Sequence, residues 1–83
     1  MDSILVEVYL PSTNNSYDIR IPRKCVMWEV TKLVSQALTE LSNGFYKADD
    51  KAVLCDRDSA TVFNINLSVE ELGLTNGSKL MLI

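Results

Sequence analysis

Few side chains of this 83-residue chain could carry out chemistry, and their spacing does not assemble a reactive site. The sequence has no histidine and two cysteines, Cys25 and Cys55. A structural zinc site needs four closely spaced ligands, commonly Cys and His, so these two distant thiols predict no metal site. In a cytosolic protein such thiols are usually reduced and pack as small hydrophobic side chains. We therefore expect free thiols at both positions, with a disulfide as the alternative.

Two pairs of neighbouring carboxylates, Asp49-Asp50 and Glu70-Glu71, are the remaining candidates for acid–base chemistry. Asp49-Asp50 lies in a charged stretch and is more simply explained as loop charge. Glu70-Glu71 lies where a first helical turn is expected, and acidic side chains there are favoured by the helix dipole. No glycine-rich phosphate loop follows a predicted strand, and no nucleophile has a base to activate it. The sequence therefore predicts a protein that is not an enzyme and has no cofactor.

Composition and charge indicate one folded domain. Apolar residues make up 47% of the chain, which contains three glycines and two prolines, and this balance is typical of globular proteins. The net charge is −3 with the eight Lys and Arg residues scattered, whereas nucleic-acid binding needs a concentrated basic face. No signal peptide or membrane-spanning stretch is recognisable. We expect a single domain over residues 1–83, located in the cytoplasm.

Alternating apolar residues predict a β-hairpin at the beginning of the chain. Every second residue from Ile4 to Leu10 is apolar, as is every second residue from Tyr17 to Ile21. This period of two is typical of strands with one buried face. Residues 11–16 (PSTNNS) are turn formers and separate the two strands. Pro22 cannot donate to a strand ladder and therefore suits the end of the second strand.

From Val26 the apolar period changes to that of an amphipathic helix. Apolar side chains recur three or four positions apart, as one stripe of a helix requires; they are Val26, Val30, Leu33, Val34, Ala37, Leu38 and Leu41. Ser42-Asn43-Gly44 is expected to end the helix, with Asn43 or Gly44 in the left-handed conformation. Because a helix of about four turns is marginal alone in water, its stripe must pack on the apolar face of the hairpin.

The second half of the chain predicts two short strands, a helical turn and a final strand. Residues 52–55 form a short apolar run between charged stretches, and residues 61–63 form a second, shorter one. Ser68–Glu71 is a capping box, with Leu67 and Leu72 at the positions of a hydrophobic staple. Gly73 can end this turn. Asn76-Gly77 favours a tight turn, and residues 79–83 alternate as a last strand.

This order of elements predicts an α+β fold, the ubiquitin-like β-grasp roll (ββαββ), in which one main helix packs across a mixed sheet. The sequence more specifically resembles the YukD/EsaB family, the ubiquitin-like proteins of type VII secretion systems in Gram-positive bacteria. The hairpin from Ile4 to Ile21 and the helix at Val30–Val34 share in the resemblance. The stretch Leu72–Leu80 (LGLTNGSKL) is its most specific part, and residues 43–66 match less well.

The resemblance implies a function in binding rather than in catalysis. A member of this family is expected to be an accessory or regulatory component of the secretion apparatus. Its protein partners would be the secretion ATPase or membrane subunits, which could recruit it to the cytoplasmic side of the membrane. The alternative is a ubiquitin-like modifier or sulfur carrier. Such proteins act through a flexible Gly-Gly tail, whereas this sequence finishes in the strand-like residues Lys79–Ile83 (KLMLI).

Two surfaces are candidates for protein binding. If alternate residues of the first and last strands face the helix, the intervening apolar residues form a patch on the uncovered face of the sheet, around Glu7; they are Leu5, Tyr9, Met81 and Ile83. The alternative is that loops or the middle segment cover them. The second candidate is Trp28, because exposed tryptophans often anchor interfaces. Alternatively, Trp28 precedes the regular helix or folds onto residues 22–25.

Overall fold

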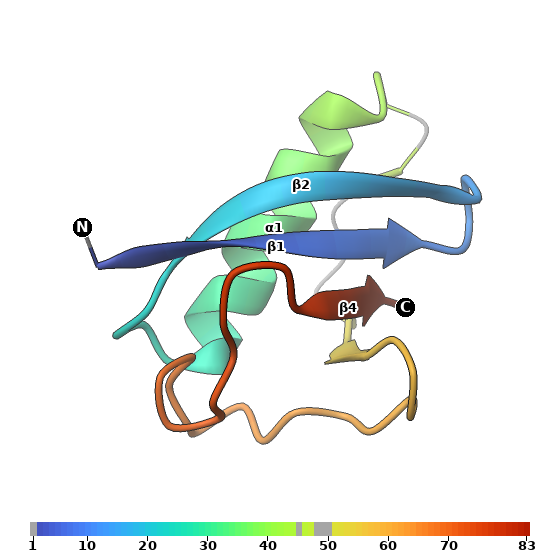
Figure 1. Ribbon diagram of the computed structural model, residues 1–83. Helices are drawn as coiled ribbons and strands as arrows, with labels where there is room; N and C mark the ends of the chain where they lie inside the picture. The colour runs from blue at the N-terminus through green and yellow to red at the C-terminus, as the bar shows by residue number, and fades with distance from the viewer. Residues whose placement is uncertain (1, 45, 48–50) are drawn as a thin grey trace.

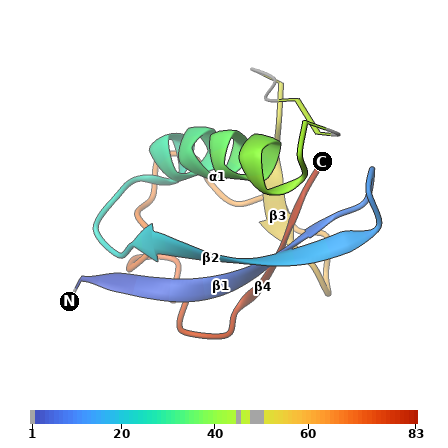
Figure 2. The same ribbon diagram turned by 90° about the horizontal axis from the view of Figure 1, so that it is seen from above.

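The computed structural model describes residues 2–44, 46–47 and 51–83 and contains four strands and one helix among them. The strands are β1 (Ser3–Leu10), β2 (Asn15–Pro22), β3 (Leu54–Asp56) and β4 (Lys79–Leu82), and the helix is α1 (Met27–Leu41). All four strands belong to one sheet of order β2-β1-β4-β3. The helix lies on one side of this sheet (Figure 1; Figure 2). The acidic pair Asp49-Asp50 lies outside the described residues.

The predicted hairpin is formed by β1 and β2. The two strands pair antiparallel from Ser3 opposite Pro22 to Leu10 opposite Asn15. Ile4, Val6, Val8 and Leu10 are all buried, as the alternation predicts. The turn is shorter than expected and spans residues 11–14, with Asn14 at a φ of 55°. Asparagine tolerates this left-handed conformation better than most residues, so it can close the turn.

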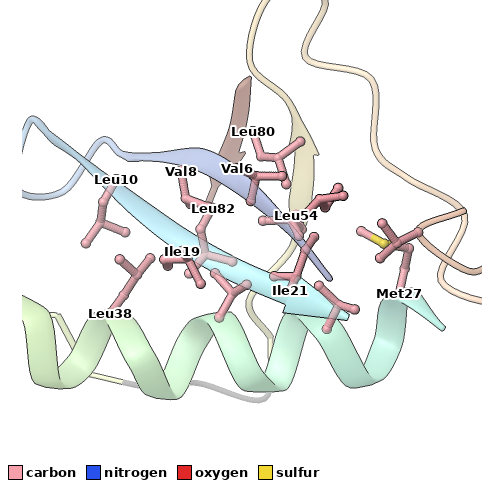
Figure 3. Packing of buried hydrophobic residues seen from close by; sticks show 14 residues of the cluster. Val6, Val8, Leu10, Ile19, Ile21, Met27, Leu38, Leu54, Leu80 and Leu82 are labelled. Carbon is pink, nitrogen blue, oxygen red and sulfur yellow. The ribbon is translucent and has the colours of Figure 1, made fainter. Parts of the chain in front are cut away.

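The last strand lies beside the first, which makes the sheet mixed. β4 pairs parallel to β1 and antiparallel to β3, with Met81 opposite both Tyr9 and Cys55. Leu80 and Leu82 of β4 point into the core between the sheet and the helix. Figure 3 shows Leu38 of α1 directed toward the apolar side chains of the hairpin. This arrangement is the ubiquitin-like β-grasp that the order of elements predicts.

The helix is present where expected, but its buried face is rotated from the predicted stripe. Val30, Val34 and Leu38 are buried as predicted, whereas Leu33 and Leu41 are 41% and 51% exposed. Met27 and Ser35 are buried instead. The polar Ser35 is accommodated because its hydroxyl is hydrogen-bonded to the Tyr46 hydroxyl at 3.0 Å. Leu33 lies on a flank of the helix, about 100° around from the centre of the buried apolar residues, whereas Leu41 is the last residue of α1.

The middle segment forms less strand than the sequence predicts. β3 begins at Leu54 rather than at Ala52, although the Val53 and Ile83 backbones still exchange hydrogen bonds of 2.8 and 2.9 Å. The expected strand at residues 61–63 is a single antiparallel bridge between Cys55 and Val62. Val62 is 56% exposed. The segment therefore lacks the buried face that would favour a longer strand.

The capping box is formed in both directions. The Ser68 amide donates to Glu71 Oε1 at 2.9 Å, and the Glu71 amide donates to Ser68 Oγ at 3.1 Å. The Leu72 amide donates to the Ser68 carbonyl at 3.1 Å, which gives one helical turn. Gly73 follows at a φ of 73°, a conformation that glycine adopts without steric cost. This turn positions the chain for the tight turn at Gly77, whose amide donates to the Leu5 carbonyl.

Within the described part of the chain, no helix has the length and apolar character that crossing a membrane requires.

Candidate protein-binding surfaces

The two cysteines are free, as predicted. Cys55 is fully buried, and its thiol lies 3.5 Å from the Met81 carbonyl oxygen. Burial raises the pKa of the Cys55 thiol, and the neighbouring Asp56 carboxylate raises it further. Because the thiolate is the reactive form, these surroundings make Cys55 a poor nucleophile. Cys25 is half-buried against the core.

Three of the acidic side chains that the structure describes, Asp56, Glu70 and Glu71, have structural partners. Glu71 closes the capping box, and Glu70 forms an ion pair of 2.9 Å with Arg23. The Asp56 carboxylate accepts hydrogen bonds from the amide and the hydroxyl of Ser59 at 2.9 and 3.0 Å, and these bonds lower its pKa. Among the described residues, no cluster of three Cys, Asp or Glu side chains could hold a metal ion. Binding surfaces are therefore the remaining candidates.

The open face of the sheet carries the first predicted surface. Tyr9 and Met81 are register partners in β1 and β4, and Ile83 follows two residues later on the same side. Leu5 is separated from these three, because Glu7 and Lys79 pair across the strands between them. Leu5 is 38% exposed and Ile83 is 60% exposed, whereas Tyr9 and Met81 are half-buried. The four side chains thus lie around Glu7, but not as one uninterrupted apolar patch.

Arg57 covers part of this face. Its guanidinium lies 4.5 Å from the centre of the Tyr9 ring and forms a 3.2 Å ion pair with Glu7. The Tyr9 hydroxyl in turn donates to Asn14 Oδ1 at 2.7 Å. These contacts give the middle of the face a polar character. A partner that docked here would have to accommodate the Glu7–Arg57 pair, whose desolvation is costly unless it is compensated.

A more apolar surface surrounds Trp28, the second predicted candidate. The side of α1 that carries Trp28 forms one wall of a groove of about 440 Å³, and residues 52–54, 62, 63 and 65 form the other wall. We call it the Trp28 groove. Trp28, Val62 and Ile65 are 47%, 56% and 54% exposed at its rim. Large apolar side chains that cluster at a hollow are typical of interaction sites, and Trp28 is the strongest anchor type among them.

Backbone hydrogen bonds at the start of α1 hold the two walls together. Val26 begins the helix without a capping side chain, so the first helical amides need other partners. The Met27 amide donates to the Leu67 carbonyl at 2.8 Å, and the Trp28 amide donates to the Ile65 carbonyl at 3.1 Å. These bonds place Ile65 beside Trp28. Trp28 therefore belongs to the regular helix, and the alternative that Trp28 precedes the helix is wrong. Trp28 also borders a second hollow, which Pro22 and Cys25 line as well.

Among the described residues that line the Trp28 groove, Lys32 is the one that carries a charge. It lies one helical turn beyond Trp28 in α1. No ion pair to Lys32 is formed within residues 2–44, 46–47 and 51–83. The other polar lining groups are neutral: Thr31, Ser35 and Gln36. The groove therefore suits an apolar segment that carries a carboxylate near Lys32.

The contribution of Val62 and Ile65 to this surface is not predicted from the sequence. Ile65 lies between Asn64 and Asn66 and belongs to no apolar pattern of a strand or a helix, so its place on the surface could not be predicted. Val62 was instead assigned to a short strand. The only local signal was that two large apolar residues occur in a segment with no period of its own.

Comparison with known proteins shows the fold of the chain. No protein-family model and no curated protein matches the sequence. Among solved structures, the ubiquitin-like domain of the type VII secretion system protein ECCD1 of Mycobacterium tuberculosis has a TM-score of 0.76 at 16% identity, covering 100% of this chain and 99% of that one. The EccD5 ubiquitin-like domain of Mycobacterium xenopi has a TM-score of 0.71 at 18% identity, covering 100% and 94%.

A larger assembly contains a similar domain. A chain of the MycP5-free ESX-5 inner membrane complex has a TM-score of 0.75 at 18% identity, covering 100% of this chain but 21% of that one. Identities this low establish a shared fold and nothing finer. The chain therefore has the ubiquitin-like fold found in domains of type VII secretion proteins.

Proposed function

We propose that this protein is a non-enzymatic interaction module of a bacterial type VII secretion system and a member of the YukD/EsaB group. The observation that carries the proposal is the superposition of the whole chain on ubiquitin-like domains of two type VII secretion proteins. The sequence resemblance at Leu72–Leu80 points to the same systems. The module would act in the cytoplasm, at the cytoplasmic side of the secretion apparatus.

The Trp28 groove is the surface that best fits such a role. Half of the Trp28 side chain is already buried against the fold, which holds it in place, and the exposed half is free to bury a partner's apolar side chain. Lys32 can pair with a carboxylate at the margin of the contact. The proposed partner is thus an apolar, acidic segment of the secretion ATPase or of a membrane subunit.

The open sheet face is the second candidate surface for the same function. Tyr9, Met81 and Ile83 lie together at one end of this face. Arg57 lies over the Tyr9 ring and covers part of this apolar surface.

Secretion of the system's substrates from the native host distinguishes these surfaces. Ile65→Asp introduces charge into the groove but keeps the backbone carbonyl that accepts from Trp28. Asn64→Asp is the matched control, because it adds the same charge at the preceding residue and retains the side-chain oxygen that accepts from the Asn66 amide. The sheet-face variant combines Leu5→Asp with Met81→Asp.

We expect secretion to be lost with Ile65→Asp and retained with Asn64→Asp, at equal abundance of folded protein. Loss with the sheet-face variant alone would transfer the function to that face. Full secretion with both the groove variant and the sheet-face variant would refute the proposed role.

A further inference from the structure

The outer edge of β2 has backbone groups without partners in the sheet. The Glu7 amide donates to Ser78 and the Leu5 carbonyl accepts from Gly77, so odd-numbered residues of β1 direct their backbone toward β4. Even-numbered residues of β1 therefore face β2, where they pair with odd-numbered residues, as in Val6 opposite Ile19. It follows that Ser16, Asp18 and Arg20 direct their backbone N–H and C=O groups away from the sheet.

This edge is long and unprotected. β2 has eight residues and is the outermost strand on its side of the sheet (Figure 1). Edge strands usually avoid pairing by being short or by carrying charged side chains, above all lysine, or an internal proline. β2 has neither lysine nor a proline before its last residue, Pro22. Such an edge is suited to pairing with another strand.

The charges on β2 select a second copy of the same strand. Asp18 lies directly across from Glu7 on β1, and like charges in this position are unfavourable. Glu7 is compensated by Arg57, whereas Asp18 forms no ion pair within the described residues, and neither does Arg20. Both Asp18 and Arg20 are exposed. If two β2 strands pair antiparallel about Ile19, Asp18 of each copy lies opposite Arg20 of the other.

The backbone geometry allows this register, and the charges disfavour pairings that are shifted along the strand. Asp18 and Arg20 would exchange both backbone hydrogen bonds with Arg20 and Asp18 of the second copy, which satisfies the outward-facing groups. Shifting the pairing by two residues places Asp18 opposite Asp18, or Arg20 opposite Arg20, and both arrangements are repulsive. Shifting it by one residue would direct the core-facing side chains of one copy to the solvent face.

An apolar flank of α1 accompanies this edge. In antiparallel edge pairing the two-fold axis is perpendicular to the sheet, so both helices lie on the same side of the joined sheet. At about 100° per residue, Leu33 lies about 140° around the helix from Trp28, and it borders a hollow that Pro22 of β2 also lines. Leu33 is 41% exposed. It would therefore face the second copy across the axis.

We propose that the protein forms a symmetric homodimer by antiparallel pairing of the two β2 edges about Ile19, with reciprocal Asp18–Arg20 pairs and the Leu33 flanks facing each other. The β2 edge lies at the opposite end of the sheet from β3, whose residue Leu54 lines the Trp28 groove, so the test of the dimer is independent of the proposed function.

Sedimentation equilibrium of four charge variants tests the register. Asp18→Arg and Arg20→Asp should each weaken self-association at least about tenfold, because both cross-strand pairs become repulsive. An equimolar mixture of these two variants should recover a heterodimer, since every pair then joins opposite charges. Asp58→Arg and Lys79→Asp change the net charge equally on exposed parts of the surface away from β2 and from the Leu33 flank and should leave the dimer intact.

Amide hydrogen exchange of the unmodified protein gives a second measurement that needs no substitution. Raising the protein concentration should slow exchange at Asp18 and Arg20, while exchange at the Ser12 amide of the hairpin turn stays unchanged. A protein that remains monomeric at its highest attainable concentration would overturn the proposal. So would a dimer that survives both single variants or whose formation leaves the Asp18 and Arg20 amides unprotected.

Discussion

Removing the Ser68 hydroxyl should destabilise the protein and loosen the start of α1 together. Ser68→Ala deletes the acceptor of the Glu71 amide, a hydrogen bond of 3.1 Å at a residue that is 9% exposed. Loss of a capping hydroxyl costs about 1 kcal/mol, within a range of about 0.5–2. With a urea m-value of about 1 kcal/mol/M for a small protein, the unfolding midpoint should fall by about 1 M. The corresponding decrease in Tm is about 4–8 °C.

Matched variants identify the capping box as the cause. Ser68→Thr keeps a hydroxyl and Glu71→Gln keeps an acceptor that a capping box accommodates, so both should change the midpoint little. Glu71→Ala removes the reciprocal bond to the Ser68 amide. The double variant Ser68→Ala with Glu71→Ala should lose less stability than the sum of the two single variants, because both bonds order one turn.

Hydrogen exchange connects this turn to the groove. The Met27 and Trp28 amides donate to carbonyls of residues 67 and 65, just before the box. In Ser68→Ala these two amides should exchange faster than in the unmodified protein, while amides in the middle of α1 change only with global stability. An unchanged urea midpoint, or unchanged exchange at Met27 and Trp28, would refute this account of how the groove wall is held.

Three further outcomes follow from the packing and the titrating groups. An alkylating reagent should modify Cys25 well before Cys55 in the folded protein, as mass spectrometry of peptides can show, and equal rates would contradict the burial of Cys55. Hydrogen bonds from Ser59 are the main cause that lowers the pKa of Asp56 below its ordinary 3.8, so the stabilising contribution of Asp56 is present above its unfolded-state pKa and is lost as pH falls through its folded-state pKa. Asp56→Asn should therefore make the free energy of unfolding depend less on pH in the acid range. An unaltered dependence on pH would contradict this. Leu72→Ala should cost on the order of 2 kcal/mol in urea unfolding, because Leu72 is half-buried against the core, and a midpoint unchanged by it would contradict its role in the C-terminal turn.

Local patterns predicted the hairpin and the C-terminal turn well. The burial of Val6 and Val8 follows from alternation alone, and the capping box depends on residues three positions apart. Both features are determined by neighbours in the sequence, so a single sequence contains the information that specifies them.

Features that depend on distant residues could not be predicted in the same way. Leu33 is as apolar as Val34, and a helical period cannot show how wide the contact with the sheet will be. The position of Arg57 over Tyr9 joins residues far apart in the chain. The Trp28 groove depends on the hydrogen bond from the Trp28 amide to the Ile65 carbonyl, which no local pattern indicates.

The single tryptophan of the chain allows a direct measurement of docking in the groove. The protein can be labelled with 5-fluorotryptophan, so that Trp28 gives one ¹⁹F resonance, and titrated with the purified cytoplasmic part of the secretion ATPase or of a membrane subunit. The exposed 47% of this side chain should become buried on docking, which at about 25 cal/mol per Å² of a side chain of about 250 Å² is worth about 3 kcal/mol. We predict a saturable change of the resonance, and an affinity about 100-fold weaker for Trp28→Ala. A partner that binds without changing the Trp28 resonance would contradict the assignment of the groove, and absence of binding to every cytoplasmic part of the apparatus would contradict the proposed function.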